Sequence, residues 1–367
     1  MYYTAWTPIG FFSGFQGGIH QGGKLYVKIS PDDLLLATSE NIARAAQVIQ
    51  NGGLVAFPTE TVYGLGADAL NVEAITRIFS AKERPVADPL IVHLSGLEQV
   101  SSVARSTPPI AEKLAKTFWP GPLTLILPKQ PAVPGLVTSG LDTVAVRVPD
   151  HPVALALIRA AQCPIAAPSA NRFGHTSPTT ARHVWDDLQG RVDIILDDGE
   201  TTVGVESTVL DISTSPPRIL RPGGITQEML EAVIGTVTIS RQHRSVTKGL
   251  PSPGMLKKHY APHTEMVLFL GENARERLIA EVKTACTAGK LVGALALDED
   301  VEILKAAGAV VYTLGADIAS VARHLYAGMR WLDKQNVDVI VCRGFGESGL
   351  GLAILDRLVC AATRVVT

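Results

Sequence analysis

The chain reads LVAF at residues 54–57 and PTETVYGLG at residues 58–66, so an apolar run passes directly into a polar segment. Four apolar residues after Gly52-Gly53 predict a short buried strand. Upstream, residues 41–50 have the pattern of a helix that ends at the paired glycines. The polar segment thus begins where a strand ends.

Further strands are predicted downstream, and they do not alternate strictly with helices. Asn71 can cap a helix that Pro85 forbids to continue. Apolar runs that predict strands lie at 90–94, 123–127, 143–148, 194–196, 208–212 and 218–220. The mixed order and the short strands favour an α/β domain built on a twisted, partly antiparallel sheet over a doubly wound one.

The last hundred residues have a more regular pattern. Four apolar strands at 267–270, 291–297, 310–314 and 337–341 are separated by helical stretches. In one stretch a single apolar face is made by Ile318, Val321, Ala322, Leu325, Met329 and Leu332. Strand–helix alternation predicts a smaller Rossmann-like domain with a parallel sheet.

A length of 367 residues favours two domains. Basic residues, prolines and glycines between 240 and 264 are typical of a linker. We therefore expect an N-terminal extension at 1–33, a first domain at 34–239, a linker at 240–264 and a C-terminal domain at 265–367.

Composition excludes several classes of protein. An apolar fraction of 46% excludes a disordered chain. No apolar run approaches the roughly 20 residues that span a bilayer, and the first thirty residues lack a signal-peptide pattern. The cysteines form no CxxC pair, so we expect buried free thiols and a cytoplasmic protein; they are Cys163, Cys286, Cys342 and Cys360. A net charge of −2 gives no global basic field, so any anion site must be local.

Five polar segments stand where strands of the first domain end. They lie at 58–66, 82–93, 143–149, 167–179 and 206–224. Together they supply fixed cations but no paired catalytic carboxylates, metal-ligand cluster, GxSxG elbow or Walker loop. A nucleotide would be held by lysine, arginine, hydroxyl groups and a helix end, an arrangement suited to stabilising triphosphate charge.

Arg147 gives the clearest physical argument. Strand side chains alternate faces, so Val144, Val146 and Val148 pack one way while Arg147 points the other way. An unpaired buried charge is very costly, so this guanidinium needs a partner. A protein carboxylate is one candidate. A substrate carboxylate, gripped through two parallel hydrogen bonds, is the other.

Other polar residues also allow a structural and a functional interpretation. Ser177 and Pro178 predict the N-cap and first position of a helix, whose amides could either be capped or bind phosphate. Lys82 and Arg84 follow a helix C-terminus, where cations complement the dipole without further function. His93 on an apolar strand is either a core histidine or part of a site.

In this order, the segments resemble the YrdC-like family of threonylcarbamoyl-AMP synthases. The matching strings are PTETVYGLGADA (58–69), KERP with PLIVHL (82–94), VAVRVP (144–149), SAN with SPT (169–179) and ESTVLDI with ILRPGGIT (206–226). SPGMLKKHYAP (252–262) and GLGLAILDRLVCAA (349–362) resemble the long, two-domain branch. The likeness runs from about residue 38 to the end, and seven strings in register are highly specific.

The resemblance implies a nucleotidyltransferase. Threonine's amine would be carbamoylated by bicarbonate, and the carbamate would attack the α-phosphorus of ATP, giving L-threonylcarbamoyladenylate and pyrophosphate. The product would serve threonylcarbamoyladenosine modification of tRNA next to the anticodon, through downstream threonylcarbamoyl-transfer machinery. Mg²⁺ is expected on the triphosphate, held mostly by phosphate oxygens and water.

The resemblance also implies site residues. Threonine would be held by Thr61, His93, Arg147, Ala167 and Ser207, with Arg147 on the carboxylate. ATP would be surrounded by Lys82, Arg84, Asp88, Thr143, Ser169, Asn171, Ser177, Arg221 and Tyr260. Many members of the family have asparagine where this chain has Asp88, so this carboxylate could face ribose or base. No catalytic base and no protein metal ligand are implied. The linker, with Tyr260 near His259, would close over the pocket as a lid.

Two other functions fit parts of the sequence. A non-catalytic double-stranded-RNA or tRNA-binding module disagrees with the neutral net charge and the lack of an exposed basic–aromatic stripe, so we expect no stable nucleic-acid binding. A dinucleotide-binding oxidoreductase is suggested by Gly344, Gly346, Gly349 and Gly351. Those glycines lie near the end of the sequence, so the acidic residue that would bind ribose about twenty residues later has no place. A tight turn or a docking surface suits them better.

Overall fold

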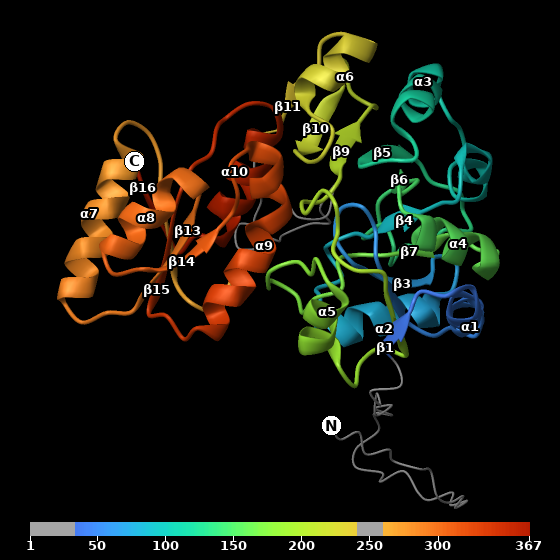
Figure 1. The fold of residues 1–367 in the computed structure, drawn as a ribbon. Helices are drawn as coiled ribbons and strands as arrows, with labels where there is room; N and C mark the ends of the chain where they lie inside the picture. The colour runs from blue at the N-terminus through green and yellow to red at the C-terminus, as the bar shows by residue number, and fades with distance from the viewer. Residues whose placement is uncertain (1–33, 241–259) are drawn as a thin grey trace, which may run out of the picture.

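The computed structural model describes residues 34–240 and 260–367, which form two β-sheets in consecutive parts of the chain (Figure 1). The expected N-terminal extension at 1–33 and the linker segment at 241–259, with Lys257, Lys258 and His259, lie outside the described residues. Of the expected lid string, only Tyr260, Ala261 and Pro262 are described.

The first sheet is mixed, as expected. Its strands, in the order β1-β8-β2-β3-β7-β4-β6-β5-β9-β10-β11, are β1 Leu34–Leu36, β2 Val55–Phe57, β3 Gly64–Asp68, β4 Ile91–His93, β5 Leu123–Pro128, β6 Thr143–Arg147, β7 Ile165–Ala166, β8 Ile194–Asp197, β9 Thr208–Asp211, β10 Arg218–Arg221 and β11 Thr238–Ile239. β4 and β6 are parallel, whereas β5 and β6 are antiparallel. Parallel and antiparallel neighbours thus meet at β6.

Helices surround this sheet. They are α1 Ser39–Gln50, α2 Val72–Lys82, α3 Pro109–Phe118, α4 Pro152–Ala161, α5 Ala181–Leu188 and α6 Gln227–Ile234, with a 3₁₀ helix at Leu97–Ser102. α2 begins where the sequence predicts, because the Asn71 side chain accepts hydrogen bonds from two amides of the first turn. It ends at Lys82, and the C-cap residue Glu83 adopts the left-handed conformation (φ 56°).

The predicted start of α5 is wrong. The helix begins at Ala181, and the hydroxyl of Thr180, not of Ser177, accepts the capping bond from the amide of His183 (3.2 Å). The carbonyl of Pro178 accepts a hydrogen bond from the amide of Tyr63 (2.9 Å). Residues 177–179 are therefore tied to the 58–66 segment and cannot also start a helix.

β3 was not expected, because its sequence contains two glycines and follows a polar segment. Gly66 explains why they are needed. A Cβ atom there would lie 2.7 Å from a ring carbon of Phe57 on β2 and 2.8 Å from Cγ2 of Ile165 on β7. The missing side chain lets the neighbouring strands close over β3.

The second sheet is parallel throughout. Its strands, in the order β14-β13-β15-β12-β16, are β12 Met266–Phe269, β13 Val292–Ala296, β14 Val310–Thr313, β15 Val339–Arg343 and β16 Arg364–Val366. Its helices are α7 Ala274–Thr287, α8 Asp298–Ala306, α9 Ile318–Lys334 and α10 Gly349–Ala361. The sequence predicts four of the strands and the parallel pairing. The strand order, however, departs from the 3-2-1-4-5 start of the dinucleotide-binding fold.

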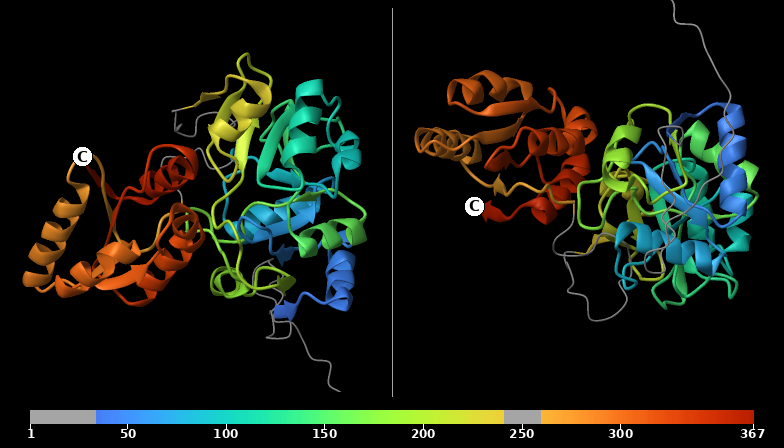
Figure 2. Two further views of the ribbon diagram at one scale, coloured as in Figure 1. Left: turned by 45° about the horizontal axis from the view of Figure 1, so that its top comes forward. Right: turned by 90° about the horizontal axis from the view of Figure 1, so that it is seen from below.

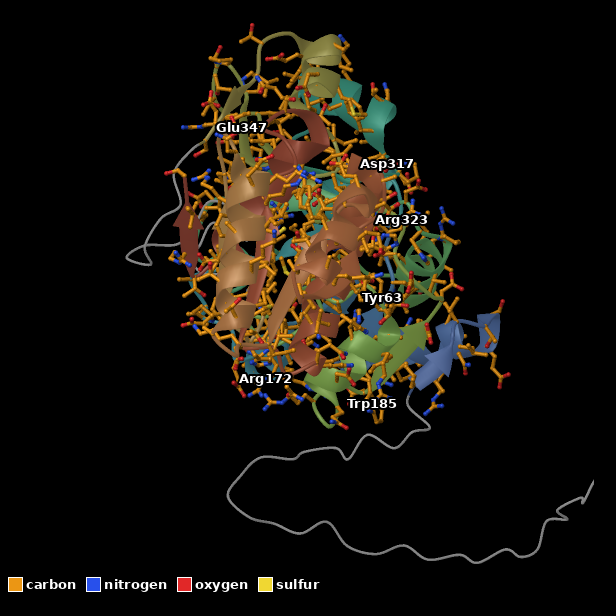
Figure 3. The ribbon with its side chains drawn as sticks, turned by 60° about the vertical axis from the view of Figure 1, so that its left-hand side comes forward. Tyr63, Arg172, Trp185, Asp317, Arg323 and Glu347 are labelled. Atoms are coloured by element: carbon orange, nitrogen blue, oxygen red, sulfur yellow. The ribbon has the colours of Figure 1, made fainter. Side chains whose placement is uncertain are left out.

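α9 and α10 lie on the side of the second sheet that faces the first domain (Figures 1 and 2). Asp317 at the N-cap of α9 and Arg323 further along mark this helix in Figure 3. Arg323 donates to the carbonyl of Thr202 (3.1 Å), and Arg330 forms an ion pair with Asp187 (2.7 Å). The two domains thus share a bonded interface.

The helices named above differ in length and apolar character. Among the described residues, none of them is long and apolar enough to cross a membrane.

Gly66→Ala should destabilise the protein. The added methyl group meets two packed side chains at less than 3.0 Å, and overpacking of this kind costs about 1–3 kcal/mol. Gly135→Ala is the matched control, because a Cβ atom there has nothing within 4 Å. Urea unfolding should give a lower midpoint for Gly66→Ala only. Equal midpoints for both variants would contradict the packing described here.

Candidate active site

A cavity opens where β4, β6 and β10 end in the first domain. The predicted site residues that line it are Thr61, Arg84, His93, Arg147, Ala167, Ser169, Ser207, Arg221 and Tyr260. Lys82, Asp88, Thr143, Asn171 and Ser177 are predicted site residues that do not line it. The structure therefore brings the whole expected threonine set, and part of the expected ATP set, to one cavity.

Arg147 combines the two roles that its sequence position allows. One terminal nitrogen lies 2.6 Å from the Glu60 carboxylate, and the other donates to the Thr61 hydroxyl (3.0 Å). Its Nε donates to the carbonyl of Gly121 (3.3 Å). The guanidinium is thus paired with a protein carboxylate and also lines the cavity. Its fixed orientation leaves it able to meet an anionic ligand.

His93 lies beside Arg147, because β4 and β6 pair His93 with Arg147 in parallel register. The ring is buried. Burial, and next the charge of Arg147, lower the pKa of His93 to about 3. The imidazole is therefore neutral near pH 7 and adds no second positive charge beside the arginine. As a cavity-lining residue, it is more than core packing.

Two hydroxyl groups of the cavity wall are bonded to its arginines, that of Thr61 to Arg147 and that of Ser207 to Arg221. The Thr61 hydroxyl lies 2.8 Å from that of Thr59. The Ser207 hydroxyl lies 2.8 Å from that of Thr124 and accepts a hydrogen bond from Arg221 (3.2 Å). These bonds fix the two hydroxyls at the cavity wall.

Arg84 is held by the residues that follow it. Its guanidinium donates to the carbonyls of Asp88 and Pro89 (3.1 and 2.9 Å) and lies 2.8 Å from the Asp88 carboxylate. Asp88 is fully buried and does not line the cavity. Its carboxylate is turned to Arg84, and its contact with ribose or base stays a prediction.

Lys82 does not line the cavity either. Its ammonium group donates to the carbonyls of Ser169 and Asn171. Burial, and next the nearby charge of Arg84, hold the pKa of Lys82 well below its usual value. The Asn171 amide in turn donates to the carbonyl of His175 (2.7 Å). Lys82 and Asn171 thus shape the loop that carries Ser169 into the cavity wall.

Thr143 and Ser177 complete the set that does not line the cavity. Thr143 is the first residue of β6, at the opposite end of the strand from Arg147. The Ser177 hydroxyl donates to the Glu206 carboxylate (2.6 Å).

Two buried carboxylates were missed by sequence reasoning, although both stand in the quoted motifs. Glu60 lies between two threonines, and Glu206 precedes Ser207. Each pairs with an arginine, Glu60 with the cavity-lining Arg147 (2.6 Å) and Glu206 with Arg357 of the second domain (2.7 Å). Both carboxylates could have been expected in the sequence, because a buried arginine needs an anionic partner.

The chemistry of the cavity is that of an anion site. Arg84, Arg147 and Arg221 reach it from three separate segments and are almost fully buried. Guanidinium groups bind carboxylates and phosphates through paired hydrogen bonds. A ligand with both a carboxylate and phosphates fits such a wall.

Comparison with known proteins agrees with this arrangement. Residues 47–223 match the family model described as telomere recombination, and residues 225–363 match the model of the C-terminal domain of threonylcarbamoyl-AMP synthase. The chain is 47% identical to the threonylcarbamoyl-AMP synthase of Pyrococcus abyssi, over 86% of this chain and 92% of that protein. It is 45% identical to the Bacillus subtilis protein of the same name, over 90% and 95%.

Solved structures agree in both domains. The crystal structure of P. abyssi Sua5 with L-threonine has a TM-score of 0.83 and 44% identity, covering 90% of this chain and 96% of that one. The structure of a double-alanine variant of the same protein has a TM-score of 0.82 and 44% identity, over 90% and 95%. The likeness spans both sheets, the cavity and nearly the whole of each relative. The chain belongs to the threonylcarbamoyl-AMP synthase family.

Proposed function

We propose that this chain makes L-threonylcarbamoyladenylate and pyrophosphate from L-threonine, bicarbonate and ATP. The chain is an enzyme of the nucleotidyltransferase class, as its family is. The observation that carries the proposal is the single cavity into which Arg84, Arg147 and Arg221 converge. Arg147 would bind a carboxylate there, and Arg84 and Arg221 would bind phosphates.

The threonine end is proposed at Arg147 and His93. The relative from P. abyssi was crystallised with L-threonine, which supports a threonine pocket in this fold. Arg147 would take the amino-acid carboxylate, and Glu60 would hold the guanidinium in the required orientation. Thr61, Ala167 and Ser207 line the same cavity. The neutral ring of His93 can donate or accept a hydrogen bond there.

The ATP end is proposed at Arg84, Arg221, Ser169 and Tyr260, which line the cavity. The remaining residues expected there would act from behind the wall. Lys82 and Asn171 shape the Ser169 loop, Asp88 orients Arg84, and Ser177 is bonded to Glu206. Thr143 has no contact with the cavity in this structure and remains a proposed ATP residue on the family resemblance alone.

The reaction itself asks the protein for positioning and charge stabilisation. The threonine amine and bicarbonate condense to a carbamate with loss of water. A carbamate oxygen then attacks the α-phosphorus, and pyrophosphate leaves with the electrons of the broken P–O bond. Arg84 and Arg221 would stabilise the charge that develops on the phosphates. The carbamate is the nucleophile, so no general base is proposed.

Mg²⁺ is proposed as a partner of the triphosphate, whose charge it would neutralise. The carboxylates around the cavity support this assignment. Glu60 pairs with Arg147, Asp88 with Arg84 and Glu206 with Arg357, so each is already committed to a cation. Phosphate oxygens and water are then the natural ligands of the ion.

The product would pass to the machinery that transfers threonylcarbamoyl to tRNA, and we propose a cytoplasmic enzyme without stable nucleic-acid binding of its own. All four cysteines carry free thiols, which suits a reducing compartment. For the domain limits we propose a catalytic domain at 34–239, a linker at 240–264 and a second domain at 265–367.

The purified chain should release pyrophosphate from ATP only when both threonine and bicarbonate are present. The reason is that the attacking group is assembled from these two molecules. Labelled bicarbonate, followed by chromatography of the adenylate, measures the product directly. Release of ADP, or turnover indifferent to threonine, would refute the proposed reaction.

Arg147→Ala should weaken threonine binding far more than ATP binding. Truncating one partner of a desolvated charge pair costs about 2–5 kcal/mol, or roughly 30- to several-thousand-fold in affinity. Arg84→Ala and Lys82→Ala should act mainly on ATP binding and turnover. Isothermal calorimetry with each substrate separates these effects. If all three variants lose both substrates equally, the assignment of the two ends is wrong.

A further inference from the structure

A buried polar network joins the second domain to the cavity. Glu206, directly before Ser207, accepts hydrogen bonds from the Ser177 hydroxyl (2.6 Å) and the Tyr326 hydroxyl of α9 (2.9 Å). Its carboxylate also accepts from Nε of Arg357 on α10 (2.7 Å). Glu206 lines the cavity, so two side chains of the second domain are bonded to its wall.

Arg357 is a fully buried member of this network. Its side chain is 0% exposed, although it stands in the largely apolar helix α10. Besides Glu206, the guanidinium donates to the carbonyl of Pro222 (3.0 Å), next to Arg221, and pairs with Asp356. Two of these partners, Glu206 and Pro222, belong to the first domain. Burying an arginine carries a large desolvation cost, which only well-placed partners can offset.

The same two side chains hold Tyr260, which lines the cavity from the described end of the linker. The Tyr260 ring stacks on Tyr326 with a centroid separation of 5.9 Å and an angle of 28°. The guanidinium of Arg357 lies over the Tyr260 ring, 5.1 Å from the ring centroid. Tyr260 itself is 1% exposed and has a φ of 62°, so its position is set by these contacts.

We propose that Arg357 and Tyr326 are positioning residues of the active site, through which the second domain fixes Glu206, Ser177 and the Tyr260 ring at the ATP end of the cavity. The inference rests on the proposed function. It gives the second domain a role in the reaction of the first, because without it Glu206 would lose two of its donors and the Tyr260 ring would lose its contacts with Tyr326 and Arg357.

The electrostatics of Glu206 supply a readout. Burial by itself raises the pKa of Glu206, but the charges of Arg357 on α10 and Arg221 on β10, with the Ser177 hydrogen bond, hold it at about 2. The neutral hydroxyls of Tyr326 and Tyr260 also face it, and Asp356 lies on the far side of Arg357. Without Arg357 the burial effect is less opposed, so the pKa of Glu206 rises.

Protonation of Glu206 should make the activity of the Arg357→Met variant depend on pH. In the wild type Glu206 stays ionised at every pH where the enzyme can be assayed, so it adds no pH dependence. In Arg357→Met the carboxyl takes up a proton as the pH falls from about 8 to about 5, since buried glutamates can titrate in that range. A protonated Glu206 can no longer accept bonds from all its donors. Activity then falls toward acid pH.

The experiment compares full-length variants in the synthesis assay with ATP, threonine and labelled bicarbonate. Arg357→Met should lower kcat/KM for ATP about 100-fold, as misplacement by about 1 Å can do. It should also acquire an acid limb between about pH 5 and about pH 8. Arg357→Lys, which keeps the charge but not the planar fork, should recover part of the activity and lose the limb. The double variant Glu206→Gln/Arg357→Met should lack the limb as well.

Arg330→Met is the matched control for domain docking. It removes another nearly buried interdomain ion pair, to Asp187 (2.7 Å), but has no contact with Glu206. It should lower the unfolding midpoint without an acid limb. If Arg357→Met and Arg330→Met change kcat/KM and the pH profile alike, Arg357 serves docking only and the inference is overturned.

The outcomes separate the inference from the proposed function. A wild-type chain that forms no labelled adenylate refutes the function, and the role of Arg357 with it. An active wild type with an unaltered Arg357→Met overturns the inference alone. An acid limb in Arg357→Met that Glu206→Gln abolishes supports it.

Discussion

The ion pair between Arg147 and Glu60 is the constraint on which the site depends. A guanidinium on a central strand can be buried only with an anion beside it, and Glu60 lies 2.6 Å away. The pair does more than cancel charge. With Thr61 and Gly121 it fixes the guanidinium plane, so that a carboxylate entering the cavity meets a preorganised partner. His93, kept neutral by burial, adds polarity without another charge.

The same principle recurs at the other arginines. Arg84 is held by Asp88, Arg357 by Glu206, and Arg221 by the carbonyl and hydroxyl of Ser207. Each of these cations near the cavity is thus anchored by an acceptor of the chain. Anchoring of this kind orders the strand ends on which the site is built, and in the case of Arg357 it ties the second domain to the first. A site made of positioned charge rather than of an acid and a base agrees with a reaction whose nucleophile is part of the substrate.

Much of this could be predicted from the sequence, because it follows from local patterns. Alternation along β6 placed Val144 and Val146 in the core and Arg147 on the other face, as found. Helical spacing and the Asn71 cap gave the start of α2. The family strings gave nine of the residues that line the cavity, but not Glu206.

The rest could not be predicted, because it depends on contacts between distant segments. Ser177 and Thr180 are both good caps by composition, and two long-range bonds decide between them: the Ser177 hydroxyl donates to Glu206, and the Tyr63 amide donates to the carbonyl of Pro178. β3 was missed because Gly66 is chosen for its neighbours Phe57 and Ile165 and not for strand propensity. Asp88 and Lys82 do not line the cavity, because they bond to Arg84 and to the carbonyl of Ser169, and these partners could be known only from the fold.

A crystal structure of the chain with L-threonine and a non-hydrolysable ATP analogue would locate both substrates in the cavity. The threonine carboxylate should lie on the guanidinium of Arg147, with Glu60 still beside it. The phosphates should lie toward Arg84 and Arg221. If threonine binds elsewhere and Arg147 keeps only its contact with Glu60, Arg147 is not the partner of the threonine carboxylate.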